Sequence, residues 1–421
     1  MLPLELPMIQ NWSCHNCGGC CRQHAIEVTR EEFERIVKQG WRGLPGFEPG
    51  QPIFVWHAGP FWNQRYRLAN REDGACVFLD DKGLCRIHSK FGEAAKPLAC
   101  RVYPYALHPA GKSVTVSLRF SCPSVVANRG QRLVDSIKDL REIERLVVPD
   151  AADQTSPPAL TSAVNLDWKE IRLFVAALDQ TFTAPRTAFL TRLLRALFWV
   201  NLVSQSQFTK IRGERLPDYL AIIMAAAEPE VPDDLSALLP PSRIGRVHFR
   251  LLAGQYARKD TSVEARAGWS GRWKLLQAAW RLSRGKGTVP PLQPGLREVP
   301  FAQLEQPFGG LPTGAEELLT RYFRVKIQGF HFCGPAYYDI PFVEGFQSLA
   351  LVVPSVLWIA RWIAASADRQ TLTLDDLQQA IAIADHHHGY SPLWGSYGFR
   401  SRIRTLARLG DIERLIAWYS R

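Results

Sequence analysis

Four cysteines lie within eight positions near the start of the chain, in the stretch SCHNCGGCCRQH. They are Cys14, Cys17, Cys20 and Cys21. Thiolates bind soft or borderline metals, chiefly zinc and the iron of iron–sulfur clusters. A CxxC unit suits this chemistry because a tight turn aims two sulfurs at one centre, and CxxCxxC repeats the unit with a shared middle member. Gly18 and Gly19 allow the sharp turn that this arrangement requires. The stretch therefore predicts a metal-binding loop.

The fourth cysteine of this loop raises a question of stoichiometry. Adjacent side chains usually point apart, so Cys20 and Cys21 would not easily share one tetrahedral zinc. The adjacency favours either two metal centres or one larger cluster with a spare thiol. In the second case, Cys21 would be a redox-active group.

Four more cysteines follow within the next hundred residues: Cys76, Cys85, Cys100 and Cys122. The first residues of the chain do not resemble a signal peptide, so we expect a cytoplasmic protein whose thiols stay reduced. Clustered cysteines then indicate metal ligands, and we predict that all eight bind metal. Eight thiolates could fill two four-coordinate sites, or hold one four-iron cluster and leave others for zinc or redox chemistry. Cys333 is alone, and we expect it to be a packed, buried thiol.

Other groups beside the cysteines are weaker candidates. His15, His24 and His88 lie next to cysteines in sequence and could serve as ligands. Lys96 and Arg101 would offset the negative charge of thiolates if they lie near them.

The elements around the cysteines explain how distant thiols could converge. TREEFERIVKQGW predicts a helix capped by Thr29. GACVFLDDKGLCRIH predicts a hairpin that turns at DDKG, with Cys76 and Cys85 on its strands. SKFGEAAKPLAC predicts a short helix that ends before Cys100, and YALHPAGKSVTVSLRFSC predicts a second hairpin whose return strand leads to Cys122.

Beyond this region, apolar residues recur at helical spacing. We therefore predict an α+β fold in which a small cysteine module precedes a mostly α-helical region. The expected divisions are a module at 1–147, a linker at 148–164, a helical domain at 165–284, a linker at 285–300 and a C-terminal helical domain at 301–421. The apolar run at 348–367 contains Pro354 and Arg361, which indicates a buried helix rather than a membrane span.

The segments CHNCGGCC, GACVFLDDKGLCRIHSKFGEAAKPLACRVYPY and FSC resemble the CxxCxxCC family of zinc- or iron-chelating domains. The match covers about residues 12–125, and all eight cysteines of the family pattern have a counterpart here. The chain is also similar in length and layout to longer members that are flagellin lysine-N-methylases. This resemblance implies metal binding and, through the longer members, use of S-adenosylmethionine on an acceptor protein such as flagellin. It carries no catalytic residue onto this chain.

The residues themselves contain neither a Rossmann-type glycine-rich turn after a strand nor the CxxxCxxC spacing of radical S-adenosylmethionine enzymes. Two alternatives to a metal-dependent methylase therefore stay open. One is a non-catalytic, zinc-stabilised interaction module, and the other is an iron–sulfur redox sensor.

Two further stretches could bind a partner or ligand. The net charge is +11, and residues 243–286 hold eleven Lys or Arg with three interleaved tryptophans. This stretch could be a platform for an acidic protein or nucleic acid, or its tryptophans could simply point into the core. The aromatic segment 327–346, which contains His331 and Cys333, could line a pocket or pack as an ordered loop between helices.

Overall fold

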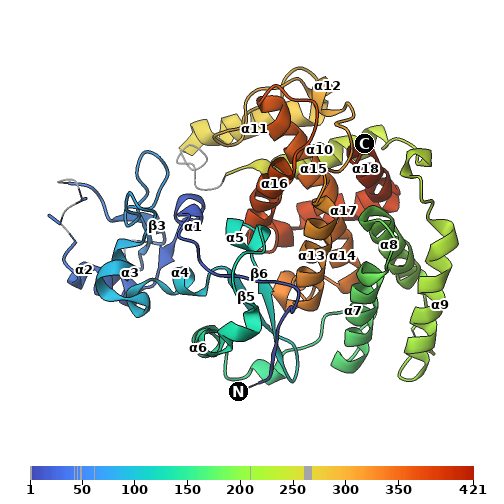
Figure 1. Cartoon of the computed structure of the whole chain (residues 1–421), viewed down its shortest axis with the longest axis horizontal. Coiled ribbons are helices and arrows are strands. Elements are labelled where there is room, and N and C mark those ends of the chain that lie inside the picture. The colour runs from blue at the N-terminus through green and yellow to red at the C-terminus, as the bar shows by residue number, and fades with distance from the viewer. Residues whose placement is uncertain are drawn as a thin grey trace.

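The cysteine-rich part of the chain forms a lobe that projects from the side of a larger helical body (Figure 1). This arrangement comes from a computed structural model that describes residues 2–41, 43–44, 46–47, 50–60, 62–208, 210–259 and 268–421. The cysteine lobe, defined here as residues 19–102, contains short helices and one small sheet. The predicted α+β fold, a small mixed region followed by mostly helices, is confirmed.

The elements up to residue 147 are short. They are β1 (Leu4–Glu5), α1 (Gly19–Gln23), β2 (Glu27–Val28), α2 (Arg30–Lys38), β3 (Phe54–Ala58), β4 (Arg65–Leu68), α3 (Arg86–Phe91), α4 (Leu98–Val102), β5 (Tyr105–Pro109), β6 (Val114–Leu118), α5 (Pro123–Val126) and α6 (Ile137–Val147). In the described part of the chain, the six strands form two three-stranded sheets. Strands β2, β4 and β3 pair antiparallel within the cysteine lobe. In the second sheet, β5 pairs antiparallel with β6, and β1 runs parallel to β6.

Local sequence explains several of these elements. Thr29 accepts a hydrogen bond from the backbone N–H of Glu32, and the Glu32 side chain accepts one from the N–H of Thr29, so α2 begins with the predicted capping box. The predicted hairpin turning between Pro109 and Lys112 is also present as β5 and β6.

The hairpin predicted around DDKG is wrong in its strands. Only isolated bridges form there, between Asn70 and Cys76 and between Leu79 and Cys85, and the chain continues directly into α3. The turn itself is present, because the Asp80 carboxylate accepts hydrogen bonds from backbone N–H groups within it. These backbone N–H groups therefore bond to the Asp80 side chain rather than to a neighbouring strand.

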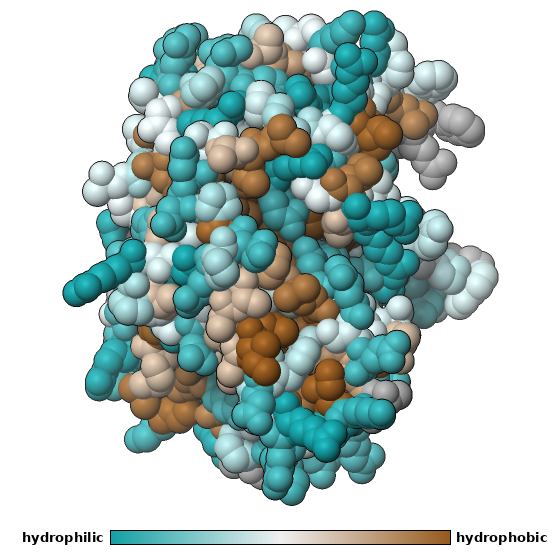
Figure 2. All heavy atoms as spheres, turned by 90° about the vertical axis from the view of Figure 1, so that its right-hand side faces the viewer, coloured by the Kyte–Doolittle hydropathy of each residue, from teal (hydrophilic) through white to brown (hydrophobic). Residues whose placement is uncertain are grey.

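Beyond residue 147, the elements of the described residues are helices joined by loops. Its α-helices are α7 (Trp168–Thr183), α8 (Phe189–Gln205), α9 (Arg215–Glu230), α10 (Arg243–Ala257), α11 (Gly268–Arg284), α12 (Phe301–Leu304), α13 (Ala315–Gln328), α14 (Phe342–Ala350), α15 (Val352–Ser366), α16 (Leu374–His387), α17 (Tyr397–Arg408) and α18 (Asp411–Tyr419). The side on which α9 lies is largely hydrophilic, with small separate hydrophobic patches (Figure 2).

The described residues form two hydrophobic cores that stabilise the fold. The larger one joins the helices to β6 and α5, so these N-terminal elements pack with the helical body. The smaller core lies in the cysteine lobe and is built around Ile36, Trp41 and Phe78. The lobe thus buries few apolar side chains of its own, and a core of this size gives limited stability without an additional cross-link.

The most apolar segment lies at the centre of the helical body. Phe342–Ser366 is long and apolar enough to cross a membrane, but 94% of its most apolar window is buried inside the protein. Arg361 is completely buried within it, and its guanidinium donates to main-chain carbonyls near the ends of α12 and α18. These carbonyls have no partner within their own helices, so the arginine satisfies them and joins three helices. The predicted buried helix is confirmed.

Candidate metal centre

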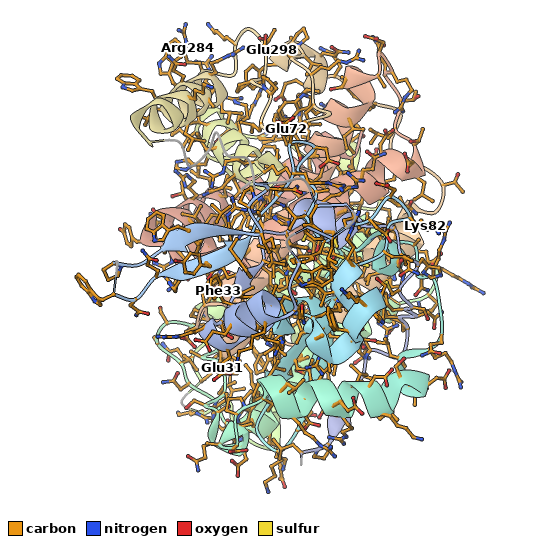
Figure 3. The ribbon with its side chains drawn as sticks, turned by 90° about the vertical axis from the view of Figure 1, so that its left-hand side faces the viewer. Glu31, Phe33, Glu72, Lys82, Arg284 and Glu298 are labelled. Atoms are coloured by element: carbon orange, nitrogen blue, oxygen red, sulfur yellow. The ribbon has the colours of Figure 1, made fainter. Side chains whose placement is uncertain are left out.

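The CxxCxxC loop is held against the turn that separates Cys76 from Cys85. Asn16 and Gly18 adopt positive φ angles of 53° and 66°, which reverse the chain sharply between the first cysteines. A Cβ atom on Gly83 would lie 2.6 Å from the carbonyl oxygen of Asn16. The two segments therefore touch through their backbones, and Gly83 is needed for this approach. Lys82, beside this glycine, lies at the outer edge of the molecule in Figure 3.

The two adjacent cysteines lie at the start of helix α1. The sulfurs of Cys20 and Cys21 are 4.0 Å apart, and both side chains are half-buried. The backbone carbonyl of Cys21 accepts a hydrogen bond of 2.8 Å from the N–H of Cys76. This bond ties the loop to the centre of the lobe, where Cys76 is buried in the small core.

Two more cysteines belong to the short helices α3 and α4. Cys85 is the N-cap residue of α3. Cys100 lies within α4, a correction to the expectation that it follows a helix. The cause is Pro97, which ends one helical segment and starts the next, because proline lacks the N–H that a helix interior requires but is tolerated at its beginning.

Four of these thiols influence one another electrostatically. Burial raises the pKa of Cys100 well above its usual value, and the nearby charges of Cys76, Cys85 and Cys20 raise it further. Burial likewise raises the pKa of Cys76 to about 12, with contributions from Cys85 and Cys20. We call Cys20, Cys76, Cys85 and Cys100 the four-thiol group.

A positive charge accompanies the four-thiol group. Burial alone would lower the pKa of Lys96, but the charges of Glu93, Cys100 and Cys85 raise it above its usual value. The ammonium also lowers the pKa of Cys20 and Cys100, although burial and the neighbouring thiols outweigh it. Lys96 thus meets the condition stated from the sequence, because its charge lies near enough to the thiols to offset thiolate charge.

The remaining thiols lie elsewhere around the loop. Cys122, the N-cap residue of α5, is buried in the large core, and the charge of Cys17 contributes to raising its pKa after the effect of burial. Cys14 is exposed, with its sulfur 3.6 Å from the Asn16 side-chain oxygen. The four-thiol group thus lies in the lobe, whereas Cys122 lies in the large core and Cys14 and Cys17 are exposed.

The thiols lie in one region, but their side chains do not surround a single metal position. Among the described residues, no group of three or more His, Cys, Asp or Glu side chains is already arranged to hold a metal ion. The donor set nevertheless suits zinc or iron, because both accept four thiolates. Burial favours the neutral form of the Cys76 and Cys100 thiols, whereas a bound cation would deprotonate its cysteine ligands and compensate their charge. Cys20, Cys76, Cys85 and Cys100 are the residues that would hold it.

Comparison with known families finds a match in this part of the chain. Residues 13–123 match a family model described as "CxxCxxCC: Putative zinc- or iron-chelating domain". This region is similar to CxxCxxCC domains, and we call residues 13–123 the CxxCxxCC domain. No curated protein and no solved structure matches the chain. The domain begins just before the first cysteine and ends just after Cys122, so it includes all eight clustered cysteines.

The histidines near the CxxCxxCC domain's cysteines have other partners. His15 Nδ1 lies 3.2 Å from the Ser124 hydroxyl, and His88 Nδ1 lies 3.2 Å from a Glu93 carboxylate oxygen. His24 stacks on His386 of α16, with ring centroids 4.7 Å apart. Burial lowers the pKa of His24 well below its usual value, so the ring is neutral at this contact.

A buried polar junction that sequence reasoning missed connects the CxxCxxCC domain to the helical body. Asp385 on α16 accepts a hydrogen bond from the backbone N–H of Ser121, the residue before Cys122. Asp385 also forms a buried ion pair with Lys326 of α13. No spacing pattern links these residues, because they are more than fifty positions apart and meet only after the helices pack.

The aromatic segment 327–346 packs between helices. His331, Cys333 and Tyr337 are buried, and Tyr337 shares a hydrogen bond of 2.8 Å with Ser348. Burial raises the pKa of Cys333 far above its usual value, so this thiol stays protonated, as expected of a packed cysteine.

Proposed function

We propose that this protein binds zinc or iron through the thiolates of its CxxCxxCC domain, and that the metal organises the domain and its boundary with the helical body. The observation that carries the proposal is that Cys21, Cys76 and Cys85 belong to one small core. The Cys20 sulfur lies 4.0 Å from that of Cys21, and the charge of Cys76 contributes to raising the pKa of Cys100. These residues are distant in sequence, and packing alone gives no reason for four thiols to meet.

The modest core of the lobe favours an organising role for the metal. Its buried apolar residues are few, and its strands are two to five residues long. Small domains of this kind commonly depend on disulfides or a structural metal. A bound zinc contributes on the order of 10 kcal/mol to folding, which would outweigh the limited hydrophobic contribution.

The separation of the thiols supports two centres rather than one. The four-thiol group supplies the number of ligands that one zinc ion or one four-iron cluster needs. Cys17 and Cys122, with Cys14 in the same loop, form a second set at the boundary. Cys21 then remains beside the first centre as a fifth thiol.

Metal and acid-labile sulfide analysis, with an absorption spectrum, tests the proposal on protein purified without oxygen. Iron with sulfide indicates a cluster, and zinc without colour indicates a structural ion. Cys100→Ser should remove the metal of the four-thiol group, whereas Cys333→Ser, the matched control outside the domain, should keep it. Full-length, folded protein that holds neither metal after reconstitution with zinc or with iron and sulfide would overturn the proposal.

A methylase activity is the more specific prediction, and its support is the layout of a CxxCxxCC domain followed by a helical body. It requires that the metal-loaded protein bind S-adenosylmethionine and transfer a methyl group to lysines of an acceptor such as flagellin. Equilibrium dialysis with labelled S-adenosylmethionine tests the first requirement. If the metal-loaded protein binds S-adenosylmethionine and the Cys100→Ser variant does not, the result would support the methylase over a purely structural metal or a redox sensor.

A further inference from the structure

Helix α11 carries large apolar side chains on its outer face. Trp273, Leu276 and Trp280 have exposed fractions of 61%, 62% and 59%. Their spacing of three and four residues places them on one side of the helix. The alternative in which these tryptophans point into the core is therefore wrong for Trp273 and Trp280. Scattered exposed apolar residues are normal, but three in one stripe on one helix mark an interaction surface.

The stripe is held rigidly by the opposite face of α11. Leu282 is buried against α10, where a Cβ atom on Gly254 would lie 2.4 Å from its side chain. Arg250 of α10 donates hydrogen bonds of 2.8 Å and 3.0 Å to the carbonyls of Leu282 and Ser283. These bonds satisfy carbonyls at the end of α11 that have no helical partner. The outer face is thus presented by an anchored helix.

Positive charge surrounds the stripe. The sequence of α11 contains no Asp or Glu, and exposed Lys274, Arg284 and Lys286 lie on it or directly after it. The Arg284 guanidinium lies 4.6 Å from the centre of the Trp280 ring. Figure 3 shows Arg284 at the outer edge of the molecule, near Glu298. The Glu298 carboxylate lies 3.2 Å from the guanidinium of Arg281, in the last turn of α11.

We propose that α11 binds the surface of an anionic lipid membrane, lying along it with Trp273, Leu276 and Trp280 inserted at the level of the headgroups. Tryptophan suits this position because its ring is apolar while its N–H remains hydrogen-bonded near water. Lysine and arginine beside the stripe would contact lipid phosphates while their aliphatic stems cover apolar surface. This pattern is that of an interfacial amphipathic helix.

The composition of the stripe favours lipid over nucleic acid. Nucleic-acid surfaces that stack bases use aromatic rings with polar groups between them. Here an exposed leucine lies between the two tryptophans, and it has no favourable contact with a phosphate or a base edge. An apolar medium bordered by negative charge matches all three side chains and the flanking cations together.

Vesicle co-sedimentation of the full-length, metal-loaded protein tests the proposal. We expect binding to vesicles that contain phosphatidylglycerol, at least tenfold weaker binding to pure phosphatidylcholine, and weakening by salt. The double variant Trp273→Gln/Trp280→Gln should lose at least tenfold in partitioning. Because both side chains are exposed, it should unfold at the same temperature as the wild type. Arg284→Gln/Lys286→Gln should weaken binding to the anionic vesicles only.

Two matched controls come from other faces of the molecule. Ile222 on α9 has an exposed fraction of 67%, and Ile222→Gln removes this apolar side chain. Lys138→Gln removes an exposed charge on α6. Neither variant should change vesicle binding. Absence of vesicle binding, equal binding to neutral vesicles, or an unaffected tryptophan double variant would overturn the proposal. Tighter binding to single-stranded DNA than to anionic vesicles, lost in the same variant, would overturn it in favour of a nucleic-acid surface.

Discussion

The ammonium of Lys326 lies 2.7 Å from the carboxylate of Asp385, and both side chains are completely buried. Asp385 also accepts hydrogen bonds from the Tyr322 hydroxyl and the backbone N–H of Ser121. Ser121 directly precedes Cys122, so this ion pair connects two helices of the body to the end of the CxxCxxCC domain. Burial lowers the pKa of Lys326, which makes the partnership with Asp385 essential for keeping the lysine charged.

Removal of one member of this pair should destabilise the protein strongly. We expect Asp385→Asn to lower the free energy of unfolding by about 3–5 kcal/mol, because it leaves a buried ammonium without its counter-charge. Denaturant unfolding measures the change. The exposed pair of Arg30 and Glu34 provides the contrast, and Arg30→Gln should cost less than about 0.5 kcal/mol. Similar losses in the two variants would show that the buried pair has no special role.

A substitution that adds one methyl group tests whether metal binding needs the contact between the CxxCxxCC loop and the neighbouring turn. Gly83→Ala would place a Cβ atom 2.6 Å from the backbone oxygen of Asn16, so the loop must move away. We expect metal affinity to fall at least tenfold, measured by competition with a chromophoric chelator. Gly92→Ala is the control, because its φ of 82° is close to the 78° of Gly83 but its Cβ would meet nothing within 4 Å. Equal affinity in both variants would contradict the importance of this contact.

Stability should depend on pH through Glu170 on α7. Hydrogen bonding to Arg212 is the main cause that lowers the Glu170 pKa to about 2. In the unfolded chain this carboxyl has an ordinary pKa of about 4.3. Between these values the unfolded state binds more protons, so the stabilisation is complete above about pH 5 and is lost as the pH falls toward 2.

Glu170→Gln checks this assignment. We expect the variant to be less stable than the wild type by about 2 kcal/mol near neutral pH, a value reduced because Arg212 is 46% exposed. The difference should shrink progressively on acidification. Arg212→Gln should reproduce the effect, and a wild-type–variant difference that is constant with pH would refute the role of this pair.

Thiol reactivity should follow burial in the folded, metal-free protein. Cys14 and Cys17 are exposed, whereas Cys333 is completely buried with a raised pKa, and the thiolate is the reactive form. Alkylation followed by mass spectrometry should label the two loop cysteines at least about 100-fold faster than Cys333. Comparable rates would mean that the helical body opens readily. Metal addition should then protect the loop cysteines while leaving the rate at Cys333 unchanged.

Short-range chemistry was readable from the sequence because it depends on neighbouring residues. The CxxCxxCC spacing identified the domain, Thr29 and Glu32 fixed the start of α2, and apolar periodicity placed the long helices. The strands predicted around DDKG failed because Asp80 satisfies the local backbone without a ladder. The assignment of all eight cysteines as ligands, the domain boundaries and the cytoplasmic location stay predictions.

The sequence by itself determined that this protein has a thiol-rich, metal-type domain followed by helices. Only the tertiary structure decided which thiols lie near one another, because a backbone hydrogen bond that sequence spacing does not predict joins Cys76 to Cys21. It also decided that Lys326 meets Asp385. Helical period places Trp273 and Trp280 on one face in any environment, but whether that face is covered depends on helices distant in the chain. Here α10 covers the opposite face, and the tryptophans remain exposed.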